Sequence, residues 1–507
     1  MAEVAVTVRG CRLIGTLGSV LLAAGSWSAG ALPFGVPDGV WAQRSPAHTV
    51  LGAAASYAGL VLLVTAWWRL GVVLRQGEPV GPGQLRPVLW SWALPLVPGP
   101  LLFSNDAYSY VAQGALAGRG WDVYQLGPAA LGGPLADNVP QMWRDAPAPY
   151  GPLAVAATRA VVAVTGEHHT VAAVLGMRLV ALCGLGLIVW GIRRLAAERG
   201  SGSGSGLSGS GAGAEWGRGG EAGALWATVL NPLALVHLVG GAHNEALMLG
   251  LMVAGLVAFR RGHWVLGTAV LTWAALVKVP AAVALLCAAA WSVGTMPDRR
   301  SGWLRGAGIA LAGLKALVLG VAACGQGWGW LTTLRGPAQV YTVLSPSTDV
   351  GRVLGLLSEG FGVGTAAGAI AAARSVGLLL GVCAVAFCAW RAPRTGPEYA
   401  TGTALLGLVV TAPVVQPWYV LWGAVPLAAV AWRLLEGAGA RLATLGLVAM
   451  VLPSGTAPTW AYALAAITGA SAAAAALVAW GPPGLAALPR LRLQERGSVR
   501  ALARTRR

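Results

Sequence analysis

Apolar residues recur along this chain in stretches of about 14 to 25 positions, separated by short polar segments, from residue 12 to residue 480. A helix that crosses a hydrocarbon core roughly 30 Å thick needs about 20 apolar residues, so the pattern predicts an all-α polytopic membrane protein. The first stretch has no evident cleavage site and more spans follow it, which favours a first span over a secretory signal. The predicted spans are residues 12–32, 50–74, 86–103, 170–192, 222–240, 246–260, 264–277, 280–294, 303–323, 366–390, 400–417, 419–433, 442–457 and 460–480.

The number of spans predicts where the chain ends lie. We expect thirteen to fifteen spans, and fourteen place both ends on one side of the membrane. The short pair on either side of KVP (278–280) are candidates for half-helices. Charged residues make up only 10% of the chain, against about 25% in a soluble domain. Residues 1–507 are therefore expected to form a single integral membrane domain.

Charged residues then orient this domain. With a cytoplasmic N-terminus, the inner segments and span ends hold 25 of the 35 Lys and Arg residues, and the outer segments hold seven. This asymmetry is the positive-inside rule, and it explains most of the net charge of +17 without a nucleic-acid partner. The Gly/Ser linker at 199–217 and the basic tail at 488–507 are then cytoplasmic, and the main polar loop at 104–169 is extracytoplasmic.

Several polar segments share the outer face of this topology. The segments at 240–245, 325–365 and 414–419 join the main loop there, which is the arrangement expected of one active site facing outward. Asp106, in SNDAYSY directly after the third predicted span, is the first candidate for a catalytic base. Its alternative role is helix capping, because Asp is a favoured N-cap residue. Asp122 and Asp145 lie among turn formers, which favours turn-stabilising roles for both.

His243, Asn244 and Glu245 lie where another span emerges, and Glu245 is suited to the first turn of the next helix. Capping and a functional role are both open there. The histidines show no HExxH pattern, and the pair at 168–169 is adjacent rather than spaced on one helix face, so no metal site is predicted. The six cysteines lie in or beside apolar stretches and indicate no disulfide framework.

Cations on the outer half are few. Lys278, Arg335 and Arg352 are candidates for holding an anionic phosphate, while Arg178 and Lys315 lie deeper and need partners or water. Ionisable residues within spans are functional candidates by default, although Lys and Arg also reach the interface along their flexible stems. The predicted spans contain no Asp or Glu well inside them, which argues against a proton-coupled transporter.

Five segments carry a family resemblance: SNDAYSYVAQGALAGRGWDVYQLGP, APYGPL, NPLALVHLVGGAHNEALMLGLMVAG, SPSTDVGR and APVVQPWYVLW. In order and spacing they resemble the actinobacterial polyprenol-phosphate-mannose-dependent α-(1→6)-mannosyltransferases, membrane glycosyltransferases of the GT-C class, over roughly residues 85 to 435. The resemblance implies a GT-C-like bundle, the lipid-linked substrate polyprenyl phosphate mannose, no cofactor, and a mannan or mannolipid acceptor such as lipomannan outside the cell membrane. It also implies that Asp106 is the base. Where family members often have HND, this chain has HNE.

The residues suit that reaction. A phosphate leaving group needs cations rather than a proton donor, so one carboxylate base is enough, whereas glycosidases use two carboxylates. A single base without a covalent intermediate implies inversion, from a β-linked donor to an α-mannoside. The expected donor and phosphate residues are Lys278, His243, Asn244, Arg352 and Arg335; those expected at the acceptor and sugar are Tyr108, Tyr110, Asp122, Tyr124, Tyr150, Glu245, Trp418 and Tyr419.

Two other classes share this composition. A lipid-linked sugar flippase or transporter should depend on cavity-lining charges, and a structural subunit should tolerate the loss of Asp106. Within the enzyme class, the donor sugar could be arabinose or glucose, because a base with cations does not distinguish the sugar.

Overall fold

The computed structural model of the protein describes residues 7–35, 41, 45–75, 80–201, 220–334, 342, 344–450, 452–455 and 460–480. These residues form helices and connecting segments, with one isolated β-bridge between Ala31 and Leu101. The helices are α1 (Val8–Ala29), α2 (Pro46–Arg75), α3 (Pro82–Ala93), η1 (Leu94–Leu96), α4 (Asp106–Gly118), η2 (Pro128–Leu131), α5 (Gly133–Asp137), α6 (Gln141–Arg144), α7 (Pro152–Thr165), α8 (Thr170–Ser201), α10 (Gly220–Ala227), η3 (Ala234–Gly240), α11 (Glu245–Arg260), α12 (Trp264–Val277), η4 (Val279–Ala281), α13 (Ala282–Gly294), α14 (Arg299–Cys324), α15 (Trp330–Thr333), α16 (Pro346–Gly360), α17 (Ala366–Thr395), α18 (Pro397–Thr411), η6 (Pro417–Tyr419), α19 (Val420–Ala431), η7 (Trp432–Leu435), α20 (Ala438–Ala449) and α21 (Trp460–Trp480).

Several of these helices can cross a membrane. Within the described ranges, six are long and apolar enough: α1, α2, α8, α14, α17 and the continuous run from η6 to η7. A seventh span results if η3 and α11, which are bent by 111° at a short break, are counted as one. The predicted all-helical, multi-span fold is thus confirmed.

The fourteen predicted spans outnumber these six or seven because the sequence-based count included shorter apolar stretches. The structure forms several of them as helices of 10 to 17 residues, such as α12 and α20. Proline explains one difference: the span expected at 86–103 ends as a helix at Leu96, before Pro98 and Pro100, and Pro95 already lies in the short η1 turn. A proline has no backbone N–H and its ring clashes with the preceding turn.

The break predicted at KVP is present. Helix α12 ends at Val277, Lys278 is extended with φ −153° and ψ 127°, and η4 begins at Val279. Lys278 therefore lies between two short apolar helices, as expected for half-helices.

The first two helices pack closely along glycines. A Cβ atom added at Gly18 would lie 2.7 Å from the Gly59 carbonyl oxygen, and one added at Gly59 would lie 2.5 Å from that of Gly18. Gly25 and the Gly52 carbonyl repeat this contact at 2.4 Å. Small residues at such an interface let two apolar helices approach where lipid gives no hydrophobic drive for association.

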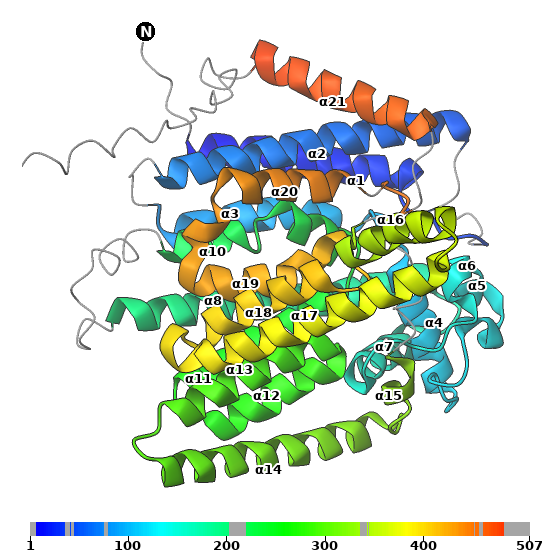
Figure 1. The fold of residues 1–507 in the computed structure, drawn as a ribbon. Helices are drawn as coiled ribbons and strands as arrows, with labels where there is room; N and C mark the ends of the chain where they lie inside the picture. The colour runs from blue at the N-terminus through cyan, green and yellow to red at the C-terminus, as the bar shows by residue number, and fades with distance from the viewer. Residues whose placement is uncertain are drawn as a thin grey trace, which may run out of the picture.

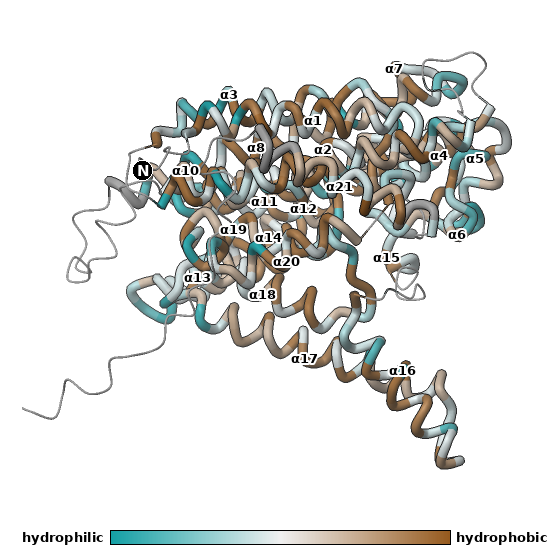
Figure 2. Tube along the Cα trace, turned by 90° about the horizontal axis from the view of Figure 1, so that it is seen from above, coloured by the Kyte–Doolittle hydropathy of each residue, from teal (hydrophilic) through white to brown (hydrophobic). Residues whose placement is uncertain are grey.

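Figure 1 shows how the helices are arranged. The long helices α1, α2, α14 and α17 run across the view, while α4 to α7 and α15 gather at the right-hand side. The turn from α13 to α14 lies at the opposite side. Figure 2 shows α16 and the adjoining part of α17 projecting from the main body. The polar segment at 104–169 is therefore largely helical and lies at one side of the bundle.

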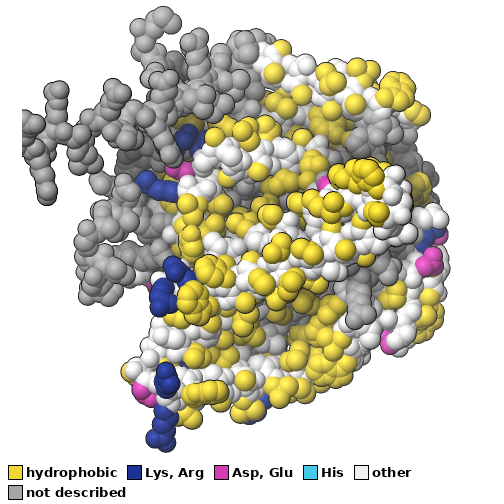
Figure 3. Space-filling model, viewed as in Figure 1, with side chains coloured by type: hydrophobic (Ala, Val, Ile, Leu, Met, Phe, Trp, Pro, Cys, Tyr) yellow, Lys and Arg dark blue, Asp and Glu magenta, His cyan; other side chains and the backbone are white. Residues whose placement is uncertain are grey.

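Charged side chains follow the same division. Figure 3 shows Lys and Arg at several points along the left-hand edge, the lowest of them where α13 turns into α14. Arg299 and Arg300 begin α14 at this turn, and Arg394 lies in the last turn of α17. The rest of the visible face is mostly hydrophobic (Figure 3), as expected of a surface in contact with lipid.

Candidate active site

Three breaks in the helices place polar side chains together in the core. They are the start of α4, the bend between η3 and α11, and the extended residue Lys278 after α12. The aromatic residues of η6 complete the group. We call Asp106, His243, Glu245, Lys278 and Trp418 the central cluster.

Asp106 is the most accessible acid of the central cluster, with 28% of its side chain exposed against 1% for Glu245. It is the first residue of α4, and Asn105 occupies the N-cap position. The capping interpretation of Asp106 is therefore wrong, and its carboxylate is a first-turn acid that the helix dipole favours. The Asp106 backbone N–H donates to Ser104 Oγ at 3.1 Å.

The surroundings of Asp106 tune its acidity. Burial raises the pKa of this carboxyl above its ordinary range, while the nearby His243 and Lys278 act in the opposite direction. The Glu245 carboxylate adds to the upward shift. A raised pKa brings a carboxylate closer to the range in which a general base works best at neutral pH.

His243 is fully buried and lies between the two carboxylates. Its Nδ1 is 3.7 Å from Asp106 Oδ2 and 3.5 Å from Glu245 Oε2. The Tyr110 hydroxyl is 3.4 Å from the same nitrogen, and the Trp418 ring lies 4.1 Å from the imidazole between centroids. The imidazole thus connects the two acids and is held by an aromatic face.

Glu245 and Lys278 form an ion pair across the bend. The Lys278 ammonium donates to Glu245 Oε1, and Trp418 Nε1 donates to the same oxygen at 3.0 Å. Lys278 Nζ also lies over the rings of Tyr419 at 4.9 Å and Tyr150 at 5.7 Å. Since an ammonium has three N–H donors, Lys278 keeps donors for a further anion.

Nine of the predicted site residues lie in this region. Besides the central cluster they include Tyr110 and Tyr150, whose rings meet at 5.0 Å edge to face, and Tyr419. Asn244 is buried at the N-cap position of α11 without a side-chain capping bond, and its Oδ1 has no hydrogen-bond partner within the described ranges.

The remaining predicted residues lie elsewhere. The Tyr108 hydroxyl donates to the Ala31 carbonyl at 2.7 Å, and Asp122 accepts from the Tyr124 backbone N–H at 2.8 Å, which is a turn contact. Arg352 is exposed on α16, with Nη1 4.0 Å from Asp349. Arg335 lies outside the described residues. Ligand roles for these four and for Tyr124 stay predictions.

Two aromatic neighbours of the central cluster were not predicted from the sequence. His237 is fully buried in η3, with its ring 4.9 Å from that of Trp418. Trp422 stacks on Tyr419 at 4.0 Å and lies 5.5 Å from Lys278 Nζ. His237 could have been named as a candidate from the sequence, because it is an ionisable residue within an apolar stretch.

The C-terminal part of the chain closes the loop before Asp106. The Phe103 backbone N–H donates to the Pro453 carbonyl at 2.9 Å. A Cβ atom added at Gly455 would lie 3.0 Å from the Ser104 backbone. Residues 452–455 therefore fix the backbone next to the candidate base.

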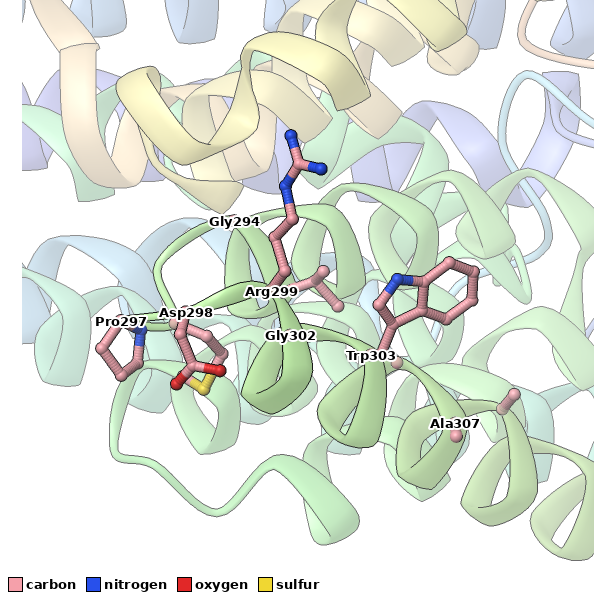
Figure 4. Close-up of a pocket in the computed structure, with 11 residues that line it drawn as sticks. Gly294, Pro297, Asp298, Arg299, Gly302, Trp303 and Ala307 are labelled. Carbon is pink, nitrogen blue, oxygen red and sulfur yellow. The ribbon is translucent and has the colours of Figure 1, made fainter.

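A separate cavity of about 960 Å³ lies at the turn from α13 to α14 (Figure 4). Its walls are mostly apolar, with Trp303 and Ala307 on α14, and Asp298 there serves as the N-cap of that helix. The cavity lining includes no residue of the central cluster. Within the described ranges, no group of three or more His, Cys, Asp or Glu residues is arranged to hold a metal ion.

Comparison with known proteins identifies the family. Residues 12–208 and 214–294 match the N-terminal domain of the α-(1→6)-mannopyranosyltransferase family, and residues 347–480 match the MptB C-terminal domain. The chain is 34% identical to a probable α-(1→6)-mannopyranosyltransferase of Mycolicibacterium smegmatis, over 88% of this chain and 82% of the relative.

Two further relatives agree. An α-(1→6)-mannopyranosyltransferase of Mycobacterium tuberculosis is 34% identical over 92% of this chain and 86% of its own length. The α-(1→6)-mannopyranosyltransferase B of Corynebacterium glutamicum is 31% identical over 88% of this chain and 77% of its own length. The family suggested by the sequence motifs is thus confirmed, and this chain belongs to the α-(1→6)-mannopyranosyltransferase family.

Proposed function

We propose that the protein transfers mannose from polyprenyl phosphate mannose to a mannan or mannolipid at the outer face of the cell membrane, forming an α-(1→6) linkage with inversion. The observation that carries this proposal is the position of Asp106. It is a partly exposed carboxylate near a cation, Lys278, whose side chain is 16% exposed, and both lie at breaks between apolar helices. Base and cation are the two groups that this transfer requires.

In this mechanism, Asp106 accepts the proton of the acceptor 6-hydroxyl as its oxygen attacks the anomeric carbon of mannose. The bond from that carbon to the phosphate oxygen breaks, and its electron pair leaves with the polyprenyl phosphate. Lys278 stabilises the charge that develops on the phosphate. Attack opposite to the leaving phosphate inverts the anomeric centre, so a β-linked donor gives an α-mannoside.

His243 and Glu245 act as supports. His243 Nδ1 faces both carboxylates, and Glu245 holds Lys278 and the Trp418 indole in place. A base held by buried neighbours keeps its working geometry with little reorganisation. Tyr150 and Tyr419, beside Lys278, offer ring faces on which a sugar can stack.

The distribution of cations supports an outward-facing site. The edge rich in Lys and Arg in Figure 3 corresponds to the side that the positive-inside rule assigns to the cytoplasm. Helices α4 to α7 lie at the opposite side of the bundle (Figure 1). On this orientation the proposed base opens toward the extracytoplasmic side, where a membrane-bound mannan or mannolipid would be found.

The test is transfer by isolated membranes. Membranes that contain the protein are incubated with radiolabelled polyprenyl phosphate mannose and a short mannoside acceptor, and the linkage in the product is determined. We expect α-(1→6)-linked mannose, and a loss of about 10²- to 10⁴-fold in the Asp106→Asn variant. Membranes that hold the inactive variant at equal amount are the control.

Other outcomes separate the alternatives. Preferential use of polyprenyl phosphate arabinose would contradict mannose as the transferred sugar. It would not contradict the role of Asp106 as the base. Movement of labelled lipid across the membrane without any glycosidic product, at equal rate in the variant, would indicate a flippase instead.

A further inference from the structure

A buried arginine lies behind the central cluster. Arg178, in the first third of α8, has no exposed surface, and a buried charge of this kind needs a full set of partners. It has them: the guanidinium has five N–H donors, and five backbone carbonyls accept from it. These are Val97 (2.5 Å), Gly99, Pro100 (2.8 Å), Val239 (3.2 Å) and Gly240 (2.9 Å).

The five carbonyls belong to two segments that lead to the two acids of the cluster. Residues 97–105 end at Asp106, and residues 239–244 end at Glu245. The Leu102 backbone N–H also donates to the Gly240 carbonyl at 3.2 Å, so the segments are bonded to each other as well. We call them the first and second approach segments.

Each approach segment contains a strained residue. Phe103 has φ 59° and Ala242 has φ 53°, and they are the only described residues other than glycine with positive φ. Each lies three positions before its acid. A left-handed conformation costs a residue with a side chain roughly 1–2 kcal/mol, and it persists only where the surroundings hold it. The five bonds from Arg178 supply such a hold on both segments.

We propose that Arg178 is a positioning residue that clamps the two approach segments together, and so fixes Asp106 relative to His243, Glu245 and Lys278. The inference rests on the proposed role of Asp106 as the base. Lysine cannot replace this clamp, because its ammonium is a single point with three donors, whereas the planar guanidinium reaches both segments at once. Trp41 supports it: the guanidinium lies 5.9 Å from the Trp41 ring, and Trp41 Nε1 donates to the Pro98 carbonyl at 3.1 Å.

The test compares Arg178→Lys with Arg441→Lys. Arg441 is also a buried arginine, but its guanidinium packs over the rings of Trp68 at 5.2 Å and Trp226 at 5.1 Å. Purified proteins are assayed for mannosyl transfer over a range of donor concentrations and of pH. Hydrogen–deuterium exchange is measured for peptides that cover the two approach segments.

We expect Arg178→Lys to lower kcat by about 10- to 100-fold with KM for the donor within about twofold, because a displacement near 1 Å costs up to about 10² in rate. The backbone amides of both approach segments should exchange hydrogen for deuterium faster than in the wild type. The acid limb of the rate profile should shift to lower pH, since water that enters the loosened site relieves the burial of Asp106. Arg441→Lys should change none of these quantities.

The outcomes separate this inference from the proposed function. If Arg178→Lys has the kcat and the hydrogen exchange of the wild type, the proposed clamp is wrong. The proposed role of Asp106 as the base would still stand. A fully active Asp106→Asn variant would overturn the proposed function, while faster exchange in Arg178→Lys would still show the clamp. If Arg178→Lys does not fold, Trp41→Phe is tested instead, since it keeps an aromatic ring and removes the bond to the Pro98 carbonyl. Unchanged kcat and exchange in that variant would also overturn the clamp.

Discussion

The ion pair between Lys278 and Glu245 gives a prediction in which stability and catalysis separate. Only 1% of the Glu245 side chain is exposed, against 16% for Lys278. Removing one partner of a buried pair leaves an uncompensated charge and costs about 3–5 kcal/mol, whereas replacing both partners is close to neutral. Lys278→Gln should therefore lower the free energy of unfolding by about 3–5 kcal/mol. Glu245→Gln should lower it less, because Lys278 can reach water along its flexible stem.

The double variant Lys278→Gln/Glu245→Gln should recover most of this loss, since two amides can bond to each other without a buried charge. The assay is denaturant unfolding of the purified protein in detergent, followed by tryptophan fluorescence. A double-mutant cycle gives the coupling energy directly. Stabilities that simply add, with a coupling below about 0.5 kcal/mol, would refute the description of this pair as a buried, mutually compensating unit.

Donor binding should respond differently in the same three variants. A charge-assisted hydrogen bond to phosphate is worth about 1.5–3 kcal/mol, or roughly 10- to 150-fold in affinity. Both variants that lack Lys278 should show this rise in KM for the donor, including the stable double variant. Glu245→Gln keeps the ammonium and should show a smaller rise. Equal donor KM in the double variant and the wild type would remove Lys278 from the phosphate site.

Four further predictions concern the same region. Asp106→Asn should not lower the melting temperature. The folded state holds the Asp106 proton more tightly than the unfolded state does, so the ionised carboxylate is unfavourable at neutral pH and its removal relieves that cost. A clear loss of thermal stability would contradict the raised pKa of this carboxyl. The transfer rate should fall on the acid side with a midpoint above the ordinary aspartate pKa of about 3.9, and a pH–rate profile flat down to pH 4 would exclude Asp106 as the base. Trp418→Phe keeps the ring beside His243 but loses the bond to Glu245, and should cost about 1.5–3 kcal/mol in an unfolding titration. Ala242→Gly should be neutral or stabilising at φ 53° whereas Ala242→Val should destabilise, and the reverse order of melting temperatures would contradict the left-handed conformation.

The apolar pattern predicted the class of fold well because a membrane helix needs only length and hydrophobicity. It predicted single breaks where the chemistry is local, as at Lys278 before Pro280. The apolar pattern could not distinguish helices of 12 to 16 residues from full membrane spans, because both are apolar stretches in the sequence. The break before Glu245 was also predicted, as the segment 240–245 that begins with Gly240 and Gly241, but the sequence does not indicate its bend of 111°.

The sequence singled out residues of the central cluster but not their arrangement, and it also named Tyr108, Asp122 and Arg352, which make other contacts. The motifs single out Asp106, His243, Glu245 and Lys278, and the structure places all four together. The pairing of Glu245 with Lys278 joins positions on separate helices, so no periodicity reveals it. The partners of Arg178 are backbone carbonyls, which every residue type carries. The sequence indicates that an arginine within an apolar stretch needs hydrogen-bond partners, but it does not indicate which residues supply them.

The bond from Phe103 to the Pro453 carbonyl has a consequence for biosynthesis. The ribosome completes Asp106 early, and Pro453 follows roughly 350 residues later, which at 5–20 residues per second takes about 20–70 s. During that interval the loop before the candidate base lacks one of its holding contacts. A nascent chain released before this late segment would therefore lack a contact that holds the backbone next to the proposed base, even if its other helices had already been inserted.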